Sequence, residues 1–167
     1  MVDKQADAAA NGEQANQPQV AVQKIYVRDA SIEVPDGPLV FTREFNPELK
    51  VDLNTSTRHI EDDGYQVALT VTVSAQQDDS NAYIVEVQQA GVFQVAGFDD
   101  DDQRAHVLGA YCPGVLFPYV RETVSAMVQR AGFPPFLLQP VNFDSLYQQQ
   151  LQQQQQQGAP AAESAPH

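Results

Sequence analysis

The chain has 167 residues and a formal net charge of −13 at pH 7. Such an acidic surface repels phosphate backbones, which argues against nucleic acid and favours a basic protein as partner, although the same charge could serve solubility alone. The single cysteine excludes an internal disulfide, and no apolar run approaches the roughly 18 residues that span a bilayer. We therefore expect a cytoplasmic protein without a secretory signal and without a membrane-inserted segment.

Both ends of the sequence lack the apolar residues that a folded core requires. Residues 1–19 are rich in Ala, Gln and Asn, and residues 148–167 consist of a glutamine run followed by GAPAAESAPH. We predict one folded domain over 20–147. A disordered arm over 1–19 precedes it, and residues 148–167 form the Gln-rich end of a last helix and a disordered tail.

The segment 20–34 has the composition of a β-strand that ends at Pro35. Strict alternation predicts that Asp29 and Glu33 share one face with Ile25 and Val27. The other face then carries Val20, Val22, Tyr26, Ala30, Ile32 and Val34. Residues 35–47 contain three prolines but also four large apolar residues, so we predict a long and unusually apolar loop.

Three further segments alternate apolar and polar residues, at 49–53, 65–75 and 83–93. The short connections between them predict an antiparallel meander. An apolar stripe of helical spacing then runs from Leu116 to Val128, in a helix that we expect to begin near Cys112 and to end at Gly132. Asn142 is suited to cap a last helix. The predicted fold is α+β, a four-stranded antiparallel sheet with a long helix and a C-terminal helix.

No group of residues matches a catalytic or metal-binding pattern. The acidic run 99–102 departs from a calcium-binding EF-hand loop at Arg104 and Ala110, and we interpret it as a solvated loop. His59, His106 and Cys112 lack the spacing of a zinc site or a protease. We therefore predict no catalytic residue, no metal and no cofactor. The alternative is a small acidic enzyme with Asp and His acid–base groups, which substrate turnover would reveal.

Asp29 and Glu33 are four residues apart on a predicted strand, which separates them by about 13 Å on one face. Paired acid–base work on one bond uses separations of roughly 5 to 10 Å, so these carboxylates are too far apart for it. They suit a patch that contacts a basic partner. Charges that protect an edge strand from aggregation are the alternative interpretation.

Apolar residues of the loop and of the C-terminal region are candidates for a groove that binds apolar peptide. The candidate set comprises Leu39, Val40, Phe41, Phe45, Phe136, Phe143 and Tyr147. Burial in the core is the alternative for each of them.

Four segments resemble the SecB family of bacterial protein-export chaperones: IYVRDASIEVPDGP at 25–38, EVQQAGVFQVAG at 86–97, LGAYCPGVLFPYVRE at 108–122 and PVNFDSL at 140–146. The resemblance covers about 20–147. It implies an ATP-independent chaperone that holds unfolded precursor proteins and delivers them to the motor SecA. It also implies a homotetramer, built as a dimer of dimers. A SecB-like chaperone that serves another partner, such as a toxin–antitoxin system, is the alternative.

The resemblance also assigns roles to individual residues. Asp29 and Glu33 match the acidic strand face that docks the zinc-bearing C-terminal tail of SecA. Val85, Val87 and Gln89 match strand positions associated with tetramer contacts, and Val85 stands where relatives often have cysteine. The expected mechanism is passive: apolar client segments lie in grooves, several grooves act together in a tetramer, and the motor supplies release.

Overall fold

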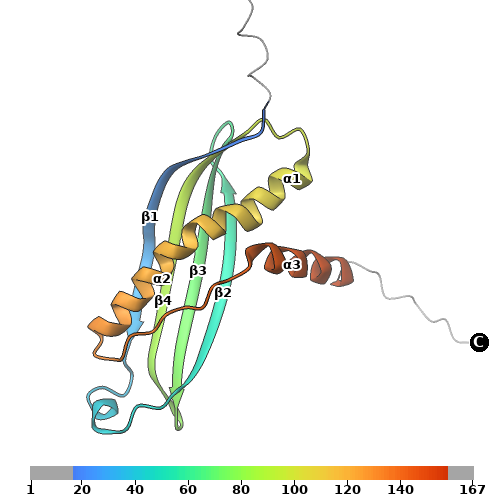
Figure 1. Cartoon of the computed structure of the whole chain (residues 1–167). Helices are drawn as coiled ribbons and strands as arrows, with labels where there is room; N and C mark the ends of the chain where they lie inside the picture. Colours follow the sequence, from blue (N-terminus) through green and yellow to red (C-terminus); the bar gives the residue numbers. More distant parts are fainter. Residues whose placement is uncertain (1–16, 158–167) are drawn as a thin grey trace, which may run out of the picture.

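One antiparallel sheet with helices on one side forms the body of the molecule (Figure 1). The computed structural model describes residues 17–157, so most of the predicted arm and the last ten residues of the predicted tail lie outside the described residues. The elements in chain order are β1 (Gln19–Glu33), the 3-10 helix η1 (Leu39–Thr42), β2 (Glu48–His59), β3 (Gly64–Gln77), β4 (Ser80–Ala96), α1 (Asp101–His106), the π-helical turn η2 (Val107–Tyr111), α2 (Cys112–Arg130) and α3 (Phe143–Gln157).

The sheet has the strand order β1-β4-β3-β2, and every neighbouring pair is antiparallel. Tight turns join β2 to β3 and β3 to β4, with Asp62 and Asp78 at positive φ, a conformation that Asp tolerates better than most residues. The predicted meander and the predicted α+β fold are confirmed. β1 is joined to the sheet by a long-range pairing with β4.

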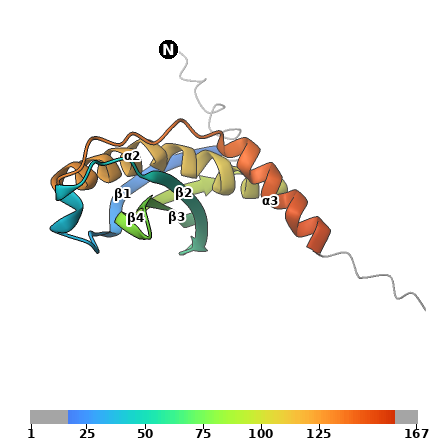
Figure 2. The same cartoon turned by 90° about the horizontal axis from the view of Figure 1, so that it is seen from below.

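The helices cover only one side of the sheet, and α2 lies across β4 and β3 (Figures 1 and 2). Alternate residues of the two central strands point to this covered face, where they are fully buried: Val67, Leu69, Val71, Val73, Val85, Val87 and Phe93. They pack against Leu116, Val120, Val124 and Val128, which are buried members of the predicted helical stripe. We call the other side of the sheet the open face.

β1 does not alternate strictly, because its pairing with β4 shifts between Val22 and Lys24 and again between Val27 and Asp29. Each β-bulge inserts one residue and reverses the faces of those that follow. Ile25 and Val27 therefore lie on the covered face, and the prediction that they share a face with Asp29 is wrong. Tyr26 lies on the open face, where its hydroxyl accepts a hydrogen bond of 3.0 Å from Gln66 Nε2.

The helical region begins earlier than predicted, because α1, η2 and α2 follow one another without a break from Asp101 to Arg130. Asp100 caps this helix, since its Oδ1 accepts a hydrogen bond of 2.9 Å from the Asp102 amide. The acidic run is thus a helix start and not only a loop, which suits the positive end of a helix dipole. No described helix has both the length and the hydropathy needed to cross a membrane.

Residues 133–142 form an extended segment, here called the strap, which leads from the end of α2 back along the covered face to α3 (Figure 1). Gly132 ends α2 with a φ of +92°, a left-handed conformation that glycine adopts readily. Asn142 caps α3 as predicted, because its Oδ1 accepts a hydrogen bond of 3.0 Å from the Ser145 amide. α3 then continues through the glutamine run and projects past β2.

Candidate functional site

An acidic patch lies on the open face, where β1 and β4 pair. Asp29 and Glu33 are exposed, and the strand between them pairs Ser31 with Glu86. The pairing places Glu86 between the two β1 carboxylates, and its Oε2 accepts a hydrogen bond of 3.1 Å from Thr72 Oγ1 on β3. The structure thus brings a third carboxylate to the surface that the sequence assigned to Asp29 and Glu33.

The sequence could have indicated Glu86, because alternation places it opposite the apolar residues Val85 and Val87. Its position beside β1 was not visible, since it depends on a pairing between distant segments. Four basic residues lie on or beside the open face: Lys24 and Arg58 are in the rows toward the opposite end of β1, Arg28 is the bulge residue beside Asp29, and Lys50 pairs with Asp52 at 3.5 Å on the far edge strand. With three carboxylates against the one guanidinium of Arg28, the patch around Glu86 is locally acidic.

Val85, Val87 and Gln89 lie on the covered face, beneath α2. Their exposed fractions are 0%, 0% and 3% within a single protomer. This corrects the prediction that these side chains themselves make contacts between protomers. The physical reason is that α2 covers the odd-numbered residues of β4, so the even-numbered ones are left to face outward. Any influence of these three residues on assembly would act through the position of α2.

The seven residues predicted to line an apolar groove do not form one site. Those of the loop lie at one end of the sheet, and those of α3 lie beside the middle of β2, with the strap between them (Figure 1). Val40 is only 7% exposed and belongs to the core, whereas Phe143, at 8% exposed, packs in the core and also lines the cavity described below. Phe143 packs edge-on against Phe117, with ring centroids 5.7 Å apart.

Aromatic rings of the strap and of β4 pack against the aromatic rings of the loop. The ring of Phe133, at the start of the strap, has centroid distances of 5.2 Å to Phe41, 5.2 Å to Phe45 and 4.9 Å to Tyr83. Phe45 is consequently half-buried, whereas Phe41 remains 52% exposed. Part of the apolar surface of the loop is thus exposed to solvent, while the aromatic contacts hold the loop in position.

Exposed apolar side chains continue from the loop along the strap and the adjacent edge strand. We call this set the apolar strip, and it consists of Leu39, Phe41, Leu49, Val51 and Leu137. Leu49 and Val51 are on the covered face of β2, where α2 does not reach, and the sequence did not single them out. Phe136, also in the strap, is half-buried and packs against the core.

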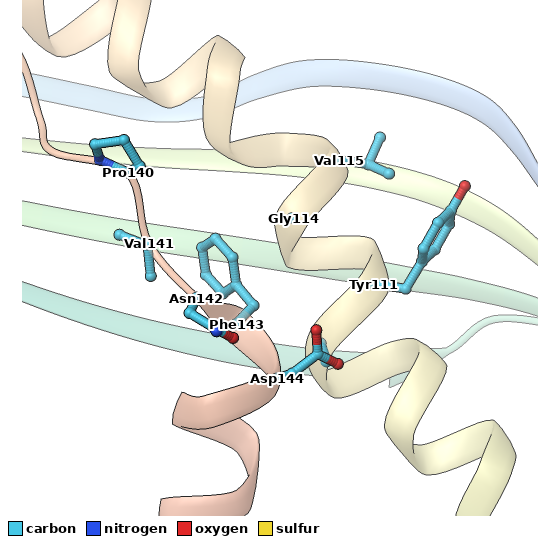
Figure 3. A pocket seen from close by; sticks show the side chains of 9 residues that line it. Tyr111, Gly114, Val115, Pro140, Val141, Asn142, Phe143 and Asp144 are labelled. Carbon is cyan, nitrogen blue, oxygen red and sulfur yellow. The ribbon is translucent and has the colours of Figure 1, made fainter.

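A cavity of about 640 Å³ opens where the strap turns into α3. Figure 3 shows Pro140 and Val141 of the strap on one side and Tyr111 of η2 and Val115 of α2 on the other. The lining is mainly apolar, with Asn142 and Asp144 at its edge (Figure 3). A concave apolar surface of this kind can accept an apolar side chain from a bound peptide.

Cys112 is fully buried, and burial raises the pKa of its thiol to about 12. The thiol therefore stays protonated at neutral pH, and a protonated thiol is a poor nucleophile. In the described range 17–157, no three His, Cys, Asp or Glu residues gather closely enough to hold a metal ion.

We expect Cys112 in the native protein to resist iodoacetamide up to pH 9, because the reagent attacks only the thiolate. In denaturant the same residue should react within minutes. Mass spectrometry of the alkylated protein measures the difference. Rapid modification of the folded protein at pH 8 would contradict the buried position.

Comparison with known proteins identifies the family. The family model of the preprotein translocase subunit SecB matches residues 13–154. The protein-export protein SecB of Alkalilimnicola ehrlichii is 54% identical over 146 residues, which cover 87% of this chain and 77% of that protein. A SecB-like chaperone of Mycobacterium tuberculosis, solved with a ChAD peptide from the HigA1 antitoxin, has a similar fold: the TM-score is 0.59 at 16% identity, over 73% of this chain and 87% of that one. The chain therefore belongs to the SecB family, and its role is that of a protein-export chaperone.

Proposed function

We propose that the protein holds unfolded precursor proteins in the cytoplasm and delivers them to SecA, as a homotetramer and without turning over ATP or any other substrate. The observation that carries the proposal is the separation of two surfaces. The apolar strip and the strap cavity lie on the covered side, whereas Asp29, Glu33 and Glu86 lie on the open face. A client and a motor can then bind at the same time.

Client binding on the covered side would use non-directional apolar burial, which suits many different sequences. The strip is broken into separate side chains along the loop, the strap and β2, so each contact is weak. Four protomers supply four such strips, and a long client that contacts several of them gains affinity through effective concentration.

Assembly into a dimer of dimers is supported by apolar surface that one protomer leaves uncovered. Tyr111 at the end of η2 and Tyr119 of α2 are about half exposed, as are Val22 and Val27 on the covered face of β1. β1 is also an edge strand with unpaired backbone groups along one side. A second copy of the chain would bury both features.

The proposed client surface predicts that Leu39→Ser combined with Leu137→Ser lowers holding activity about tenfold. Both side chains are more than half exposed, so the change removes apolar contacts with the client but few within the protein. The measurement is the concentration needed to suppress aggregation of a denatured precursor by half, with and without ATP and EDTA. The matched control is Ile60→Ser. It also replaces an exposed apolar side chain by serine, but at the turn between β2 and β3, outside the apolar strip.

Neither ATP nor EDTA should alter the activity of the unmodified protein. Equal activity of the double variant and the Ile60→Ser control would place the client surface elsewhere. A requirement for ATP would contradict passive holding.

A further inference from the structure

The attachment of α3 to the rest of the chain is confined to its first turns. Phe143 packs on Phe117, and the ring of Tyr147 lies directly against Gly109 of the π-helical turn. A Cβ atom at Gly109 would come within 2.5 Å of Tyr147 Cδ2, so the close approach depends on glycine. From Gln148 to Gln156, only Leu151 is even partly buried. A helix held at one end responds strongly to changes at that end.

An ion pair joins α3 to the end of α1 at this point. His106 Nε2 is 2.8 Å from Asp144 Oδ1, in the first turn of α3. The His106 ring also meets Tyr147 edge-on, with centroids 5.4 Å apart. Among residues 17–157 the other ion pairs lie within the loop, within β2 or within α1, so this pair alone links α3 to another element.

The charged groups that share a cavity with His106 are acidic, and Arg104, two residues earlier in α1, is paired with Asp101. Asp102, one turn earlier in α1, lines the same cavity of about 640 Å³ as His106, Tyr147 and Leu151. On the other side of Tyr147, Asp52 of β2 borders a smaller cavity of about 190 Å³, but its carboxylate lies on the open face, where it pairs with Lys50. Of the residues that the structure describes, no Lys or Arg lines either cavity. A proton taken up by His106 would therefore meet attraction from Asp144 and Asp102, while the charge of Arg104 is offset by Asp101.

We propose that His106 and Asp144 form a pH-dependent latch that holds α3 in its docked position. An imidazole gains its proton as the pH falls from 8 to 5. Protonated His106 forms a hydrogen bond with Asp144 in which both partners are charged, whereas neutral His106 keeps a weaker bond in which only the carboxylate is charged. The docked position is favoured at the acidic end of this range and loosens as the pH rises. The inference does not depend on the identity of client or motor.

The expected effect is modest, because both side chains are partly exposed, at 44% and 73%. Pairs of this kind change an equilibrium by roughly two- to fivefold. Undocking of α3 would open the cavities on both sides of Tyr147 and expose Leu151. Acidity would thus control how much apolar surface this end of the molecule offers.

Amide hydrogen exchange of α3 tests the latch in the full chain without client. Protection of Leu146 to Gln150, corrected for the intrinsic effect of pH on exchange, should be two- to fivefold greater at pH 5.5 than at pH 8.0. His106→Asn and Asp144→Asn should each bring that ratio close to one. High salt should reduce the ratio in the unmodified protein. The matched control is His59→Asn, because the His59 ring contacts Tyr65 and the Asp62 carbonyl and is not paired with α3.

Gly109→Ala tests whether the pH dependence comes from the His106–Asp144 pair or from any change that weakens the packing of α3. It should displace Tyr147 and lower the protection of α3 equally at both pH values, so the ratio is kept. Circular dichroism confirms that each variant is folded, and His106→Gln replaces His106→Asn if the latter is not. The proposal is overturned if the unmodified protein shows no pH dependence, or if both His106 variants retain it.

Discussion

Replacing Asp29 and Glu33 together by lysine should abolish binding of the SecA C-terminal tail, with an expected loss of affinity of more than a hundredfold. The two exposed carboxylates flank Glu86 on the open face, and the double reversal turns attraction for a basic partner into repulsion. Like charges brought together at an interface cost several kcal/mol. Titration calorimetry with the tail measures the loss.

The same variant should keep its ability to suppress client aggregation, because the apolar strip lies on the other side of the sheet. Glu61→Lys with Asp63→Lys is the matched control, since it makes the same change in net charge at the turn between β2 and β3. Glu86→Lys alone should also weaken tail binding, because it replaces the third carboxylate of the patch by a positive charge. Thr72, which donates a hydrogen bond to Glu86, stays in place beside it. Unchanged binding by the Asp29 and Glu33 variant would refute this docking face.

Val87→Asp should prevent folding of the protomer and not merely weaken its assembly. Val87 is 0% exposed beneath α2, and no basic residue is buried in the core around it. An unpaired charge in such a place costs about 3–5 kcal/mol, a large part of the stability of a typical domain. Thermal unfolding followed by circular dichroism measures the effect.

Gln88→Asp is the control for this substitution, because the next residue of the same strand points to the open face. It adds the same charge and should leave the melting temperature almost unchanged. A folded Val87→Asp protein that forms stable dimers would show that Val87 acts at a subunit interface, and would contradict its place in the core of one protomer.

The central sheet could be predicted from sequence because its signal is local. Alternation over 65–75 and 83–93 places β3 and β4 correctly to within three residues at each end. The covered face of β4 could not be predicted in the same way, since Ile84 and Val92 make the outward face apolar as well. Only the position of α2 decides that Val87 is buried and Glu86 is not.

Two other features could not be predicted from the sequence, for related reasons. The β1 bulges depend on the register with β4, and strict alternation therefore misplaced Ile25, Val27 and Tyr26. Residues that line a groove and residues that fill a core are both large and apolar, so the sequence does not show which role Phe143 or Leu137 has. Contact with Phe117 buries the first, whereas the second, in the strap, remains 56% exposed.

The pairing of β1 with β4 has a consequence for synthesis of the protein. β2, β3 and β4 are neighbours in sequence and can zip together through short turns as they leave the ribosome. β1 emerges first, yet its first pairing partner in β4 is Ile84 and its last is Ala96, so it must wait for a contact between segments far apart in sequence, which forms more slowly than the local turns. We therefore expect β1 to join the sheet last. Since Asp29 and Glu33 meet Glu86 only when β1 has joined, a motor that reads all three carboxylates would recognise finished chaperones and ignore nascent ones.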